Sequence, residues 1–123
     1  MEQKARKVFD LEERTLAFAM AVREFVKTLP RSVANIEDGK QVVRSSGSVG
    51  ANYIEANEAL SKKDFVMRIK IARKEAKESV YWLRLIEADD SLEAKRVILD
   101  REAVELTKIL SAILLKSAEC NLN

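Results

Sequence analysis

The sequence predicts an all-α protein whose single domain is an antiparallel up-down-up-down four-helix bundle. The first observation is its composition: the 123 residues are 47% hydrophobic and 34% charged, with only one proline and three glycines. Such a composition is typical of helical proteins. The second observation is that apolar residues recur every three or four positions in four successive segments, which is the period of a helix face. Because the connections are short, we expect antiparallel neighbours around one core over residues 10–121, after a short charged tail at 1–9.

The first helix is expected to run from Asp10 to Thr28. Asp10 is a suitable N-cap, and Pro30 disfavours helical backbone at the residue before it. Its inward face is expected to comprise Leu11, Thr15, Phe18, Val22, Phe25 and Leu29.

The second helix is expected to follow an N-cap at Asn35 and to reach about Ala59. Its inward face is expected to comprise Val42, Ser46, Val49, Tyr53, Ala56 and Leu60. The stretch RSSGSVGANYIEANE keeps this period although it holds two of the three glycines. Each interior glycine costs about 1 kcal/mol relative to alanine, so we expect close approach of a neighbouring helix here. The small residues that would allow it are Ser46, Gly47, Gly50 and Ala51.

A phosphate-binding loop is not expected in this stretch. GSVG does not match the pattern G-x-x-x-x-G-K-[ST], and no strand precedes it.

A row of polar residues runs along the same helix beside its apolar face. The row comprises Arg44, Ser48, Asn52 and Glu55, spaced by four, four and three positions. Since buried polar groups are normally hydrogen-bonded, the row predicts a mutually satisfied network between helices that fixes register or subunit packing. The alternative is a contact with a ligand or with RNA.

The third helix has the clearest start, because Ser61 and Asp64 form an S-x-x-D capping box before Phe65. Its inward face is expected to comprise Phe65, Ile69, Ala72, Ala76, Ser79, Leu83 and Ile86. The Asp89–Ser91 stretch breaks the pattern, and a fourth helix is expected to continue to about Cys120. Its inward residues are expected to be Leu99, Ala103, Leu106, Leu110 and Ile113.

The third helix also carries a second apolar stripe, which we define as Met67, Ile71, Tyr81, Trp82 and Leu85. A lone bundle should be polar on that side, and large exposed apolar patches usually contact a partner, so the stripe favours self-association. Scattered surface apolar residues are the plainer alternative. Beside the stripe runs a basic line spaced by seven, comprising Lys63, Lys70, Lys77 and Arg84. It is either a solvated face or a nucleic-acid contact.

Composition argues against several classes of function. The chain has no histidine, so it lacks the commonest general base and cannot form the Glu-x-x-His pairs of di-iron bundles. We therefore expect a protein that is not an enzyme and that needs no cofactor or metal. The net charge of +2 is small, so the total gives no strong sign of a nucleic-acid binder. No run of 18 apolar residues occurs, and Cys120 is the only cysteine. These features predict a cytoplasmic protein that does not enter a membrane.

With these residues placed, residues 9–115 resemble the bacterial four helix bundle protein family, which includes proteins encoded in intervening sequences of 23S rRNA genes. The matching residues are Gln41, Arg44, Ser45, Ser48, Val49, Ala51, Asn52, Glu55, Ala56, Ser61, Lys62, Asp64, Phe65, Ala72, Glu75, Glu78, Trp82 and Leu83. The resemblance implies a bundle that assembles into a ring-shaped homopentamer, and it supplies no enzymatic activity.

Two functions follow from these expectations. The first is an oligomer that binds RNA or DNA through the basic line. The alternative is a scaffold that recruits another protein without contacting nucleic acid. Binding that weakens steeply with salt would distinguish the first from the second.

Overall fold

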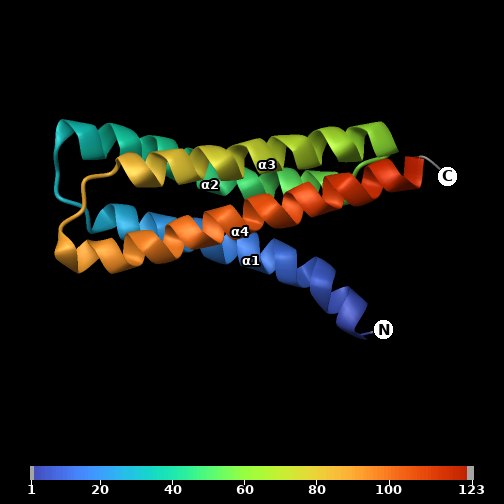
Figure 1. Cartoon of the computed structure of the whole chain (residues 1–123), viewed down its shortest axis with the longest axis horizontal. Helices are drawn as coiled ribbons and strands as arrows, with labels where there is room; N and C mark the ends of the chain where they lie inside the picture. Colours follow the sequence, from blue (N-terminus) through green and yellow to red (C-terminus); the bar gives the residue numbers. More distant parts are fainter. Residues whose placement is uncertain (1, 122–123) are drawn as a thin grey trace.

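The computed structural model describes the backbone of residues 2–121 and the side chains of residues 11–118. It contains four helices, α1 (Glu2–Lys27), α2 (Val33–Asn57), α3 (Lys62–Leu85) and α4 (Asp90–Asn121). Figure 1 shows them side by side in an up-down-up-down bundle, with the α1–α2 and α3–α4 connections at one end and the α2–α3 connection at the other. The predicted all-α four-helix architecture is confirmed.

Helix α1 begins earlier than the sequence predicted. Its backbone is helical from Glu2, so the prediction of an N-cap at Asp10 is wrong, and residues 2–9 are helix rather than a separate tail. In Figure 1 the N-terminal end of α1 diverges from the other helices. The apolar pattern could not reveal them, because a segment rich in Glu, Lys, Arg and Ala forms helix by intrinsic propensity without needing a buried face.

Helix α2 begins three residues before the predicted start. Ser32 is the N-cap, and its hydroxyl accepts a hydrogen bond from the Asn35 backbone N–H. Asn35 is buried instead, and it joins the two connections at that end of the bundle. Its amide nitrogen donates to the carbonyls of Pro30 (3.1 Å) and Glu87 (3.0 Å), and its oxygen accepts from the Glu87 N–H (3.0 Å). Asparagine is suited both to capping a helix and to forming buried hydrogen bonds, so the sequence alone did not distinguish the two roles.

The predicted N-cap of α3 at Ser61 is confirmed. The Ser61 hydroxyl accepts from the Asp64 N–H at 3.1 Å. Helix α4 has an equivalent start, since the Asp89 carboxylate accepts from the Leu92 N–H and from the Ser91 hydroxyl. These hydrogen bonds, with that from Ser91 first, hold the pKa of Asp89 below its usual value.

The core lies between the four inward faces, largely as predicted. Val22, Val42, Val49, Ile69, Leu83, Leu106 and Leu110 are fully buried. Phe65 and Ile113 are only partly buried at the edge of this core. Leu60 is fully exposed, because α2 ends at Asn57 and the helical period no longer applies to it. Its inclusion in the core was wrong.

The close approach predicted for the glycine-rich stretch occurs at one of its glycines. A Cβ on Gly50 would lie 2.8 Å from Thr15 Oγ1 and 3.1 Å from Thr15 Cβ, so α1 and α2 pack backbone to side chain there. A Cβ on Gly47 would meet only the Arg23 guanidinium, at 3.6 Å, which is an ordinary contact. Ala51 is exposed. The seam therefore consists of Gly50 and the buried Ser46, and Gly47 and Ala51 lie outside it.

None of the described helices is long and apolar enough to cross a lipid bilayer.

Candidate nucleic-acid interface

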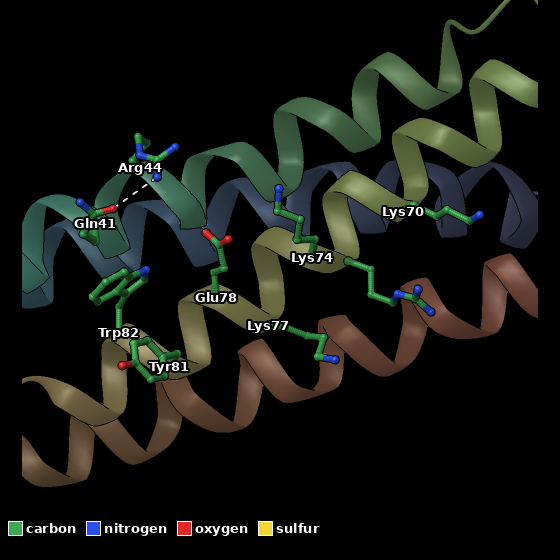
Figure 2. A pocket seen from close by; sticks show the side chains of 9 residues that line it. Gln41, Arg44, Lys70, Lys74, Lys77, Glu78, Tyr81 and Trp82 are labelled. Atoms are coloured by element: carbon green, nitrogen blue, oxygen red, sulfur yellow. Dashed lines mark hydrogen bonds between the residues drawn. The ribbon is translucent and has the colours of Figure 1, made fainter.

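The outward face of α3 and the adjoining edge of α2 enclose an open hollow of about 620 Å³. Five of its lining residues are basic, one is acidic and two are aromatic. The lining comprises Gln41, Arg44, Lys70, Arg73, Lys74, Lys77, Glu78, Tyr81 and Trp82. Figure 2 shows Trp82 and Glu78 between α3 and the α2 side chains Gln41 and Arg44, while Lys70 and Lys77 turn away from α2. We call this site the α3 hollow.

The positive charge of the chain is concentrated on α3. This helix contains eight of the 22 basic residues but only three of the 20 acidic ones, a net charge of +5. Since the whole chain carries +2, the remaining residues together carry −3. The small total charge therefore conceals one strongly basic helix.

All four residues of the predicted basic line are exposed, but they differ in their surroundings. Lys70 and Lys77 line the α3 hollow, and Lys63 lines an adjoining hollow of about 540 Å³. Arg84 instead forms a two-point ion pair with Asp100 of α4, at 2.7 and 3.2 Å. This hydrogen-bonded pairing raises the pKa of Arg84 and offsets its charge. Arg84 is thus the member least available to an external anion.

The predicted basic line omits three basic residues of the hollow, of which Arg44 was predicted only as part of the polar row. Arg73 and Lys74 lie three and four positions after Lys70, and Arg44 comes from α2. A search for strict seven-residue spacing excluded the first two, although positions three and four apart also share a helix face. The assignment of Arg44 to this hollow needed the relative placement of two helices.

The polar network predicted for the row on α2 is present only in part. Asn52 donates to the Ser48 backbone carbonyl at 2.9 Å, and its oxygen accepts from Arg68 of α3 at 3.3 Å. Arg44 is exposed and donates to Gln41 at 3.3 Å. Glu55 is exposed as well. The interhelical part of the predicted network is thus the single hydrogen bond between Asn52 and Arg68, because Arg44 and Glu55 are exposed where water can solvate them.

A buried polar contact between α2 and α3 was missed. Ser45 and Ser79 are both completely buried, and their hydroxyl oxygens lie 2.8 Å apart in a hydrogen bond. Each can also donate to a carbonyl of its own helix, Ser45 to Val42 and Ser79 to Glu75. Ser79 had been read only as a small inward residue. Its partner could be found only once the register of the two helices was known.

Two buried polar atoms of α3 lack a partner among the described residues, and only the second belongs to a residue that lines the hollow. They are Oε1 of Glu75 and Nε1 of Trp82. Glu75 is only 8% exposed, and burial raises the pKa of its carboxyl group. The nearby Glu78 raises this pKa further, whereas Arg44 and Lys74 act in the opposite direction. Since buried polar atoms are normally satisfied, these two mark a place where an outside group would be favourable.

The second apolar stripe is exposed in part. Met67, Tyr81 and Leu85 are 50%, 59% and 44% exposed, whereas Ile71 and Trp82 are half-buried toward the bundle. The stripe and the basic line therefore share the outward face of α3. Exposed apolar residues also occur on other helices, and they are Leu16, Met20, Val33, Ile36, Ile54, Val97, Ile98 and Leu115.

Within the described part of the chain, no group of three or more Asp, Glu, His or Cys residues could hold a metal ion. The side chain of Cys120 lies outside the described residues.

Comparison with known proteins places the chain in a family. The model of the 23S rRNA-intervening sequence proteins matches residues 8–112. The chain belongs to this family. A solved structure from Bacteroides thetaiotaomicron VPI-5482 is similar, with 31% identity, a TM-score of 0.72 and coverage of 88% of this chain and 97% of the other. That protein is described as one of unknown function from the S23 ribosomal protein family. No curated protein matches the chain.

Proposed function

We propose that this member of the 23S rRNA-intervening sequence family is a cytoplasmic, non-enzymatic oligomer that binds RNA or DNA through the outward face of α3. The observation that carries the proposal is the segregation of charge, with +5 on α3 and −3 on the remainder. A basic face on a nearly neutral protein is the electrostatic footprint of a polyanion partner.

The arrangement of the hollow supports a phosphate contact. Lys70, Lys74 and Lys77 project from one side of a single helix, so their ammonium groups can follow a phosphate backbone. If five basic side chains each neutralise one phosphate, the logarithm of the binding constant should fall with the logarithm of salt concentration at a slope of about −3.5 for a single strand. Raising salt fourfold would then weaken binding by roughly 100-fold.

The test compares two triple variants that lose the same charge. Lys70→Gln, Lys74→Gln and Lys77→Gln remove three ammonium groups from the hollow. The control, Lys95→Gln, Lys108→Gln and Lys116→Gln, removes three exposed ones from α4. Fluorescence anisotropy with labelled RNA and DNA, repeated over a salt series, should show weaker binding and a slope smaller by about 2 for the first variant only.

Two results would refute the proposal. If both variants lose the same affinity, binding follows overall charge and α3 has no special role. If the parent protein binds neither RNA nor DNA at low salt, the basic face serves another purpose, and the scaffold that recruits a protein becomes the better explanation.

The oligomer in this proposal is a ring-shaped homopentamer, as the resemblance implies. Its support is the part of the stripe that is exposed outside the α3 hollow, Met67 and Leu85, which a neighbouring copy would cover. A heterologous contact pairs unlike faces and closes into a ring when its rotation is right. Ile71→Asp with Leu85→Asp should release monomers whose circular dichroism remains helical. Light scattering on the parent decides the assembly: a monomer mass at micromolar concentration excludes a ring, and a dimer mass excludes the fivefold one.

Because the stripe and the basic residues share the outward face of α3, a neighbouring subunit and a nucleic acid would compete for the same surface. A ring that covered the whole face would bury several lysines at a contact, where like charges and desolvation are costly. We therefore propose that the ring leaves the α3 hollow open to solvent. Light scattering with saturating RNA should show the mass of the free oligomer plus that of the RNA, rather than dissociation into smaller species.

A further inference from the structure

We propose that the α3 hollow selects single-stranded nucleic acid, by stacking one unpaired base on the ring of Tyr81 while the neighbouring basic side chains hold the adjoining phosphates. This inference rests on the proposed function and specifies the form of nucleic acid that the site accepts.

The first argument is the placement of the Tyr81 ring. It is 59% exposed, whereas the other described aromatic side chains are buried or half-buried. Its ring meets that of Trp82 edge to face, with centroids 5.1 Å apart and an interplanar angle of 77°. Trp82 in turn packs against the hydrophobic core. The exposed Tyr81 ring is therefore held in place by the packed Trp82 ring, which lowers the entropy cost of stacking a base on Tyr81.

The second argument is the order of residues along α3. Lys70, Lys74 and Lys77 precede Tyr81 on the same outward side, so basic groups extend about 16 Å along the helix axis up to the aromatic ring. A basic track with an aromatic platform is the arrangement by which proteins bind single strands, since the track follows phosphates and the ring stacks on a base. In a duplex both faces of a base are covered by its neighbours, so Tyr81 could not stack without breaking the helix.

The third argument is the unpaired donor beside the ring. Trp82 Nε1 is buried and has no acceptor among the described residues. The indole lies next to Gln41 of α2, at the wall of the hollow (Figure 2). Gln41 accepts only a 3.3 Å hydrogen bond from the exposed Arg44, a contact that can rearrange readily. The indole N–H donates and cannot accept, and because it is buried, an oxygen of a bound base or sugar reaches it only when the Gln41 side chain moves aside.

The experiment compares Tyr81→Leu with Tyr81→Phe in the full-length chain. Leucine keeps an apolar side chain but removes the ring, whereas phenylalanine keeps the ring and removes only the hydroxyl. The probes are a labelled single-stranded oligouridylate of about twelve nucleotides and a duplex RNA of the same length, at one low salt concentration. Tyr81→Leu should bind the single strand roughly 10-fold more weakly and the duplex as the parent does, and Tyr81→Phe should behave as the parent.

Trp82 supplies an independent readout, because it is the only tryptophan in the chain. Its fluorescence should change when the parent or Tyr81→Phe binds the single strand, and it should not change with the duplex.

The outcomes separate this inference from the proposed function. Equal affinity for single strand and duplex, with no effect of Tyr81→Leu, would refute base stacking and leave the basic face intact as a binding surface. No binding of either probe would refute both. If Tyr81→Leu instead lowers the oligomeric mass measured by light scattering, Tyr81 belongs to a subunit contact and the stacking proposal is wrong.

Discussion

The sharpest prediction concerns Gly47 and Gly50, which lie three positions apart in α2 and differ in what a methyl group would meet. Neither has a positive φ angle, so no backbone strain favours glycine at either position. Alanine therefore gains helix propensity at both, by about 1 kcal/mol. Only the space around the added Cβ distinguishes the two substitutions.

At Gly50 the added Cβ would lie 2.8 Å from Thr15 Oγ1 and 3.1 Å from Thr15 Cβ, well inside the 3.5–4.0 Å at which carbon atoms attract. Thr15 cannot rotate away without loss, because its buried hydroxyl donates to the carbonyls of Leu11 (2.9 Å) and Glu12 (3.0 Å). Overpacking of this kind costs about 1–3 kcal/mol. We expect Gly50→Ala to change the free energy of unfolding by between about zero and −2 kcal/mol after the propensity gain.

Gly47→Ala meets only the exposed Arg23 side chain, so it should raise the free energy of unfolding by up to about 1 kcal/mol. The two variants should thus differ by roughly 1–3 kcal/mol. The assay is urea unfolding at one protein concentration, followed by circular dichroism, so that any coupling to assembly is the same for both. Thermal melting should give Gly50→Ala a midpoint at least about 3 °C below that of Gly47→Ala.

A third variant tests the cause. Thr15→Ala combined with Gly50→Ala removes the hydroxyl that the new methyl group would strike, so the double variant should be more stable than the sum of the two single effects predicts. Equal stability of Gly47→Ala and Gly50→Ala, or strict additivity with Thr15→Ala, would show that α1 and α2 are not in close contact at Gly50.

Two further predictions concern buried polar groups. Asn35→Ala should lower the free energy of unfolding by about 1–3 kcal/mol, because backbone groups at both connections lose their hydrogen-bond partner. The control, Asn57→Ala, loses one exposed hydrogen bond to Glu12 and should change the free energy of unfolding by less than about 0.5 kcal/mol. Equal effects of these two would contradict the linking role of Asn35. Glu75→Gln should stabilise the protein at neutral pH and not at about pH 3. Burial raises the pKa of Glu75 in the folded state, so the folded protein loses stability as pH rises from the unfolded-state pKa of this group to its folded-state pKa. Below the unfolded-state pKa the carboxyl group is protonated in both states, and glutamine then offers no advantage. A Glu75→Gln variant that is less stable than the parent at pH 7 would show that an ionic partner holds this carboxylate.

Local chemistry in the sequence determined the helical architecture and most of the core. Every residue that the apolar spacing assigned to the inward face of the first helix is buried, since a helix of fixed period turns one stripe toward its neighbours wherever it packs. The Ser61 cap was also predictable, because its hydrogen bond joins residues three positions apart. The start of α2 was not predictable, since Asn35 could either cap the helix or be buried. Its burial depends on hydrogen bonds to Glu87 in the α3–α4 connection, which is distant in the sequence.

The candidate site depended more on tertiary structure than the fold did. The sequence placed Lys70, Lys77 and Tyr81 on the outward side of one helix, because their relative directions follow from helical geometry alone. It could not bring Arg44 and Gln41 to the same hollow, pair Arg84 with Asp100, or join Ser45 to Ser79. Each of these contacts crosses between helices, so it depends on their relative rotation and axial shift. Packing of the core sets both, and close contacts such as that of Gly50 with Thr15 fix them.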